Sequence, residues 1–127
     1  MGESAGSEGA VILFAGQIVT VDWRDALPKE PGKRRPAVVV EDSELFGPSY
    51  PNVILVPLAE DPHLAIADLS VEIQPSAENG CSKRCFALAH HVTTASKQRV
   101  TPTDSKIDKR ELVEIRRLIG MSVGIEH

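Results

Sequence analysis

Aromatic residues are scarce in this sequence, which has one Trp, one Tyr and three Phe among 127 residues. The core must therefore consist mainly of Val, Ile, Leu and Ala. The hydrophobic share of 42% and the charged share of 25% are ordinary for a globular protein. A chain of this length fits one domain and can bury a core without disulfides or metals.

Cysteine is equally rare, since the chain has only Cys81 and Cys85, separated by three residues. One interpretation of this spacing is a redox pair or half of a metal site. The other, which we favour, is one loop thiol and one strand thiol. A structural zinc site needs four ligands, usually with closer cysteine pairs, and the sequence supplies no second pair. We therefore expect no metal and no cofactor, and the low cysteine content without a secretory signal favours a reducing cytoplasm.

An excess of positive charge is also missing, because the formal net charge is −4 at pH 7. No basic field surrounds the whole molecule, so any nucleic-acid site must be a local, salt-sensitive patch.

Long apolar runs are missing too. The run at residues 10–14 is too short for a signal core or a membrane span, and acidic residues precede it. We expect no membrane association.

The most informative stretch covers residues 16–40, which read as a strand, a polar loop and a second strand. Residues 17–22 include four β-branched residues in a row and predict the first strand. Residues 37–40 predict the second strand, opened by Pro36, whose missing N–H is tolerated at that position. The loop between them ends on basic residues, so we expect Arg35 where a loop meets a rigid strand.

The middle of the chain predicts further short strands. Residues 53–58 form an apolar run that suits a strand buried on both faces. Residues 69–74 alternate apolar and polar residues, as a half-buried antiparallel strand does. Residues 84–92 predict a strand, with Phe86, Leu88, His90 and Val92 at period two. Residues 93–96 predict a polar bend, and residues 99–101 predict one more short strand.

The end of the chain predicts a helix. Asp108 is a good N-cap, and Glu111 three residues later completes a capping box. We expect Gly120 as the residue just past the helix, with Arg116 and Arg117 in the last turn. The apolar face of the helix consists of Leu112, Ile115, Leu118 and Ile119.

The order of these elements predicts a mainly β domain with a C-terminal helix. Five to seven short strands followed by one helix favour a small, strongly bent antiparallel barrel. Residues 1–9 have a composition that stays disordered, and residues 10–127 form the single domain. No internal repeat or low-complexity tract interrupts that domain.

Three stretches of the sequence resemble the MazF/PemK toxins of type II toxin–antitoxin modules. They are the pattern Gly-x-Ile-Val-x-Val-Asp-aromatic with a later Arg-Pro-Ala-Val-Val-Val, the run Val-Ile-Leu-Val-Pro-Leu, and the final helix, at residues 16–40, 53–58 and 112–120. The resemblance covers nearly the whole chain. It implies an SH3-like barrel of the CcdB/PemK type, a homodimer, and a toxin that a cognate antitoxin holds in check.

The activity implied by the resemblance is metal-independent, sequence-specific cleavage of single-stranded RNA. One alternative is a degenerate member that binds RNA or a partner protein with little or no cleavage. Another is a toxin that shares the barrel but poisons a protein target such as gyrase. The Arg-Pro-Ala-Val-Val motif argues against this second alternative.

The resemblance makes Arg35 the first candidate catalytic residue, because the Arg of the family's Arg-Pro pair is catalytic. A guanidinium suits this role, since its planar fork matches phosphate oxygens and stays protonated. Where the family usually carries Thr or Ser after Val-Pro-Leu, this chain has Ala59, which has no hydroxyl. Glu60 could serve as a base instead, but neighbours on a strand point to opposite faces.

Two histidines offer a second source of acid–base chemistry. His90 and His91 stand where the toxins commonly carry a polar pair, and imidazole titrates near neutrality. On a strand, adjacent residues face opposite sides, so at most one of them would line a given groove. The competing interpretation, to which we give equal weight, is one surface histidine and one packed histidine with a hydrogen bond.

Four residues are candidates for binding the RNA backbone. The basic residues near the end of the first loop could face phosphate groups, and Thr94 matches a threonine found in many family members. A solvated charged loop, and a threonine that only bonds the local backbone, are the alternatives. The four candidates are Lys29, Lys33, Arg34 and Thr94.

Overall fold

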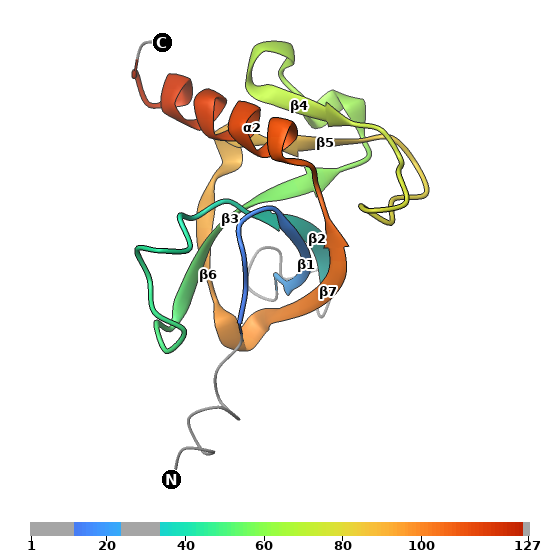
Figure 1. Cartoon of the computed structure of the whole chain (residues 1–127). Helices are drawn as coiled ribbons and strands as arrows, with labels where there is room; N and C mark the ends of the chain where they lie inside the picture. The colour runs from blue at the N-terminus through green and yellow to red at the C-terminus, as the bar shows by residue number, and fades with distance from the viewer. Residues whose placement is uncertain (1–11, 24–33, 126–127) are drawn as a thin grey trace, which may run out of the picture.

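The computed structural model describes residues 12–23 and 34–125. The predicted tail at residues 1–9 and the candidate residues Lys29 and Lys33 lie outside the described residues. The strands are β1 (Gln17–Asp22), β2 (Arg34–Val39), β3 (Asn52–Ala59), β4 (Ser70–Ile73), β5 (Cys85–Leu88), β6 (Thr93–Ser96) and β7 (Val100–Lys106). One α-helix, α2 (Lys109–Ser122), ends the described part of the chain (Figure 1). The predicted mainly β architecture with a C-terminal helix is confirmed.

Four short 3₁₀ turns connect these elements: η1 (Pro62–Leu64), η2 (Ala67–Leu69), η3 (Ala89–His91) and η4 (Lys97–Arg99). The strands form one antiparallel sheet in the order β4-β5-β3-β2-β1-β7, and β6 pairs with β3. The sheet bends strongly, and β6 and β7 run along opposite sides of it from the connection at η4 (Figure 1). Within the described ranges no backbone pairing links β6 to β7. The sheet is therefore strongly bent, as expected, but is not closed into a barrel.

The central strands are buried on both faces and separate two hydrophobic cores. In β3, Val53 and Leu55 face one core while Val56 and Leu58 face the other, because side chains alternate along a strand. The expectation for residues 53–58 is therefore confirmed. The inner core, within the ring of strands, contains Val19, Val21, Ala37, Val39, Val53, Leu55 and Val100.

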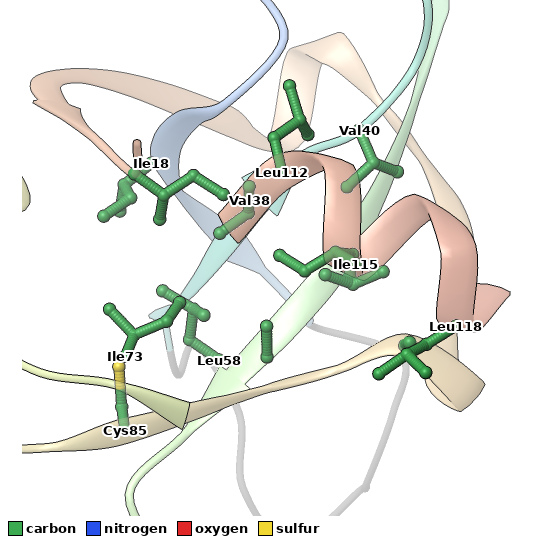
Figure 2. Packing of buried hydrophobic residues seen from close by; sticks show 13 residues of the cluster. Ile18, Val38, Val40, Leu58, Ile73, Cys85, Leu112, Ile115 and Leu118 are labelled. Atoms are coloured by element: carbon green, nitrogen blue, oxygen red, sulfur yellow. The ribbon is translucent and has the colours of Figure 1, made fainter. Parts of the chain in front are cut away.

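The outer core lies between the sheet and α2 (Figure 2). Leu112, Ile115 and Leu118 of the helix are buried in it, which confirms the predicted apolar face, and Ile119 packs against it. The sheet contributes Ile18, Val38, Val40, Val56, Leu58, Ile73, Cys85, Ala87, Ala89 and Ile107. The buried residues of the two cores are aliphatic side chains and one thiol, as the composition predicts, and Trp23 packs against the inner core from its partly buried position.

The helix begins as predicted and ends later than predicted. Asp108 accepts a hydrogen bond from the Glu111 amide at 2.7 Å, and the Glu111 side chain accepts one from the Asp108 amide at 2.9 Å. The helix continues through Gly120 to Ser122, so the prediction that Gly120 follows the helix is wrong. Gly124 has the left-handed φ of +94° instead. The amides of Gly124 and Ile125 then bond the last turn's carbonyls, which completes a Schellman motif.

Arg116 lies in the middle of the helix rather than in its last turn. Its guanidinium donates to the carbonyl oxygens of Val40 and Glu41, at 3.0 and 2.9 Å. These carbonyls follow the end of β2, where the sheet no longer provides amide partners. Arg116 therefore ties α2 to the sheet by satisfying partly buried backbone oxygens.

Three predictions about the strands are wrong. The second strand starts at Arg34, not at residue 37, because Arg34, Arg35 and Pro36 still pair with β1. The predicted strand at residues 84–92 ends at Leu88 and turns through η3, and the predicted bend at residues 93–96 is strand β6. The cause is that one edge of β3 has two partners: the end of β3 pairs with β5, and the start of β3 pairs with β6. The chain must turn between these two pairings.

We predict that the helix face stabilises the domain through Ile115. Ile115→Ala should lower the free energy of unfolding by about 2–5 kcal/mol, because the removed methyl groups are fully buried. Val113→Ala is the matched control, since Val113 is 56% exposed on the same helix and its truncation should cost less than about 0.5 kcal/mol. Urea unfolding of both variants measures the difference. Equal losses would show that the helix does not pack as described.

Candidate active site

Arg35 is the second residue of β2, so it lies on a rigid strand next to the point where that strand begins, as expected. It stands directly opposite Val21 of β1, and directly opposite residues share a face of the sheet. Val21 is fully buried in the inner core, whereas Arg35 is exposed. The arginine side chain therefore stands at the open end of the inner-core face, on a backbone held by strand pairing.

The register of the sheet aligns other residues with Arg35. Ala37 of β2 stands opposite Pro57 of β3, and continuing this antiparallel register by two residues brings Arg35 level with Ala59. On the other edge of β3, Ala59 pairs with Phe86 of β5, which in turn pairs with Glu72 of β4. One face of four strands thus carries a row of side chains, here named the Arg35 row: Arg35, Ala59, Phe86 and Glu72.

A second arginine covers the aromatic ring of this row. The Arg84 guanidinium carbon lies 5.4 Å from the centroid of the Phe86 ring, a cation–π distance. Its Nη1 lies 3.7 Å from Glu72 Oε2, and the two charged side chains are 54% and 43% exposed. Because this pair is largely solvated, it holds Arg84 over the ring only weakly. The site therefore has an arginine-covered aromatic ring one strand beyond Ala59, beside the Glu72 carboxylate.

Sequence reasoning missed Arg84 and Phe86 as site residues. The period-two pattern placed Phe86 with the apolar side of its strand, yet Cys85 and Ala87 point into the outer core and Phe86 points away from it. The sequence did contain a signal for this pair. Arg84 stands two residues before Phe86, one of only three phenylalanines, and residues i and i+2 share a strand face. Their position beside Ala59 depends on strand order, which the sequence pattern did not give.

Glu60 lies on the opposite face of the sheet from the Arg35 row. It lines a cavity of about 300 Å³ together with Pro36, Leu58 and Cys85, which alternate with the residues of the row. This position agrees with the expectation that Glu60 and its neighbour Ala59 point to opposite faces. The carboxylate is therefore separated from Arg35 by the sheet.

His90 and His91 lie on η3 and not on a strand. Their rings contact edge to face, with centroids 4.3 Å apart and planes at 73°. The expected strand at these two residues is therefore wrong, because a 3₁₀ turn does not alternate its side chains as a strand does. The turn packs against α2 and β3, on the edge of β3 away from β2. The structure thus places both histidines across β3 from Arg35.

The two histidines differ in their surroundings. Nδ1 of His90 is buried and has no hydrogen-bond partner among the described residues. His91 is exposed, and partial desolvation, followed by electrostatic repulsion from the neighbouring His90, lowers its pKa. A lowered pKa keeps the His91 imidazole neutral at physiological pH. In this form it can accept a proton.

The two candidate RNA-binding residues that the structure describes, Arg34 and Thr94, lie on different strands. The Arg34 side chain donates to Thr101 Oγ1 at 2.8 Å and stands on the opposite face of β2 from Arg35. Thr94 is exposed on β6, opposite Ile54 of β3. Lys29 and Lys33 belong to the stretch outside the described residues.

The described residues also bear on metal binding and on membrane insertion. In residues 12–23 and 34–125 no group of three or more His, Cys, Asp and Glu side chains is arranged to hold a metal ion. A larger hollow of about 850 Å³ lies at the start of α2, but the capping box already occupies the amide of Glu111 there. None of the helices that the structure describes is long and apolar enough to cross a membrane.

Comparison with known proteins decides the family. A family model described as PemK-like, MazF-like toxin of type II toxin–antitoxin system matches residues 14–123, which is most of the chain. The chain belongs to the MazF/PemK toxin family. A search of curated protein sequences found no match.

Solved MazF structures share the fold at low sequence identity. An endoribonuclease in complex with its cognate antitoxin, from a mycobacterial species, has a TM-score of 0.72 and 14% identity, with 91% of this chain and 99% of that chain covered. MazF from Deinococcus radiodurans has a TM-score of 0.71 and 21% identity over 91% and 99% of the two chains. The MazE–MazF complex from the same organism gives 0.69 and 22% over 91% and 100%. The family resemblance noted in the sequence is confirmed.

We predict that His90 keeps the pKa of His91 low. His90→Ala should raise the pKa of His91 toward its ordinary value, because both the neighbouring charge and part of the desolvation are removed. Proton NMR titration of the imidazole signals measures the change. His63→Ala is the control and should leave the His91 titration where it is, since His63 contacts Asp61 and not the histidine pair. An unchanged His91 pKa in the His90 variant would contradict the contact.

Proposed function

We propose that this MazF/PemK-family toxin is a metal-independent, sequence-specific endoribonuclease that cleaves single-stranded RNA. Family membership supports a toxin role, and solved relatives with the same fold are named endoribonucleases. The observation that carries the proposal is the position of Arg35. It is an exposed cation on a strand, in register with Ala59 and Phe86, where an extended polynucleotide can reach it.

Cleavage without a metal uses the ribose 2′-hydroxyl as the nucleophile. The 2′-oxygen attacks phosphorus and gives up its proton to a base, the bond to the 5′-oxygen breaks, and the leaving 5′-oxygen takes a proton from a protonated side chain or water. The products are a cyclic phosphate and a 5′-hydroxyl. Arg35 stabilises the negative charge that develops on the phosphorane oxygens. Its guanidinium acts as a fixed positive group and does not transfer the proton.

The proton of the 2′-hydroxyl needs an acceptor, because Ala59 supplies no hydroxyl. His91 is our preferred acceptor, since it is exposed and its lowered pKa favours the neutral imidazole. His90 is second because its Nδ1 is buried, and Glu60 is third because it lies on the other face of the sheet. Activity should rise with pH through the His91 titration, at a lower pH than an unshifted histidine would give.

The substrate also needs contacts beyond the scissile phosphate. We propose that a base stacks on the Arg84–Phe86 pair next to Ala59, since arginine planes and aromatic rings are common platforms for unpaired bases. Arg34, Thr94, Lys29 and Lys33 would contact the RNA backbone. These local cations provide the attraction that the net charge of −4 does not.

The proposed partners follow from the family. We propose a cytoplasmic homodimer that a cognate antitoxin binds and silences, and solved structures of similar fold include MazE–MazF complexes. An acidic, disordered antitoxin segment would gain from charge pairing with Arg34, Arg35, Lys29 and Lys33. The same cations would then be withheld from RNA.

A second candidate function is RNA or partner binding without efficient cleavage. The observation that favours it is Ala59, which lies in the Arg35 row at the position where the family usually has a hydroxyl. Ala59→Thr separates the two functions. A gain of cleavage in a nearly inactive wild type would indicate a decayed nuclease site.

We predict that Arg35→Ala lowers the cleavage rate by about two to three orders of magnitude, because one phosphorane contact is lost. Arg35→Lys should restore little, since the bidentate fork is absent. Arg110→Ala, on the exposed side of α2, is the matched control and should cleave at the wild-type rate. The assay follows a mixed RNA with EDTA present throughout. Full activity in Arg35→Ala, or activity that returns only with a divalent ion, would overturn the mechanism.

We predict that Phe86→Ala and Arg84→Ala weaken RNA binding, because each removes part of the stacking platform. The loss should correspond to about 1–3 kcal/mol per unstacked base. Fluorescence anisotropy with a short single-stranded RNA measures the dissociation constant. Phe46→Ala is the control, because Phe46 contacts Tyr50 away from the Arg35 row. Equal affinities for all three variants would exclude a base on this pair.

A further inference from the structure

The two cysteines, which the proposed function does not use, lie close together. Cys81 is in the loop before β5 and Cys85 is its first residue, so the positions predicted from the sequence are confirmed. Their Sγ atoms are only 3.9 Å apart, and both thiols are free. A disulfide joins sulfur atoms about 2 Å apart, and a side-chain rotation can close a gap of this size.

The loop holds Cys81 at this position through specific contacts. The buried Asn79 side chain accepts hydrogen bonds from the amides of Ser76 and Cys81, at 3.0 and 2.9 Å. Its amide group donates to the Gln74 carbonyl at 2.8 Å. Gly80 follows with a left-handed φ of +64°, and a Cβ there would lie 2.7 Å from Ser105 Oγ. The approach of the two sulfur atoms is therefore built into the loop.

The two thiols differ in access. Cys81 is partly exposed and lines the 300 Å³ cavity, whereas Cys85 is 5% exposed and belongs to the outer core. Burial, together with the nearby Cys81, raises the pKa of Cys85 to about 12. An oxidant in solution therefore meets Cys81 first. The sulfur of Cys81 is then within reach of Cys85.

We propose that Cys81 and Cys85 form an oxidative modification site, at which a peroxide converts the two thiols into a reversible intramolecular disulfide. The Cys81 sulfur attacks one peroxide oxygen and breaks the O–O bond, giving a sulfenic acid and water. The Cys85 sulfur then attacks the Cys81 sulfur. The S–O bond breaks and the oxygen leaves as water with the Cys85 proton. Two thiols and one hydrogen peroxide thus give one disulfide and two waters.

The disulfide would close a short loop of the chain that contains Ser82, Lys83 and Arg84. Arg84 is the residue that covers Phe86, so oxidation would restrain one side of the proposed stacking platform. This consequence rests on the proposed function, whereas formation of the bond does not. An experiment can therefore contradict the disulfide and the proposed RNA platform independently of each other.

The test treats the reduced full-length protein with hydrogen peroxide and then labels it with N-ethylmaleimide in guanidinium chloride, which unfolds the chain so that the buried Cys85 thiol can react. In intact-mass spectra, the untreated wild type should take up two maleimides. The oxidised wild type should take up none, with a mass lowered by about 2 Da. Dithiothreitol should restore both labelling sites, and a non-reducing gel should show a monomer band.

The matched variants are Cys81→Ser, which changes the more exposed thiol and spares the core, and Cys85→Ala. Neither should give the species lighter by about 2 Da, and Cys85→Ala should accumulate oxidised Cys81. Two maleimides on peroxide-treated wild type would overturn the proposal. So would a disulfide-linked dimer or a Cys81 sulfinic acid as the main product. If Cys85→Ala does not fold, the wild type and Cys81→Ser decide the outcome.

Discussion

The pairing of β3 is the constraint on which the rest of the structure depends. One edge of β3 pairs with β2, and the other edge pairs with β6 near its start and with β5 near its end. Both faces of the strand are buried, so its side chains belong alternately to the inner and outer cores. A strand buried on both faces and both edges has its register strongly fixed. The positions of neighbouring strands follow from it.

The same constraint divides the chemistry of the molecule between two faces. Arg35 and Phe86 reach one face of the sheet, and Glu60 with the two cysteines lines the cavity on the other. The segment from Cys81, which lines the cavity, to Arg84, which covers Phe86, is four residues long, so a short piece of chain joins the two faces. Oxidation on one face is thereby linked to the proposed RNA platform on the other.

The sequence predicted the strongly patterned elements well. The first strand, the apolar third strand and the capped helix were correct because each pattern reports local burial or a local hydrogen bond. The turn at His90 and His91 was missed because the apolar alternation of β5 continues into it. Nothing local marks the point where β3 changes its partner. Gly120 was assigned to the helix end because a glycine there is common, although the outer core holds the helix for two more residues.

The sequence by itself determined the fold class, the family and the first candidate, Arg35. These follow from hydrophobic periodicity, a capping box and three motifs in order, all of which are local in the chain. Only the tertiary structure decided which residues stand beside Arg35 and which stand behind the sheet. It brought Phe86 to Ala59, put Glu60 on the opposite face, and set two sulfur atoms 3.9 Å apart. The physical reason is that strand order and register depend on packing between distant segments, which no local pattern records.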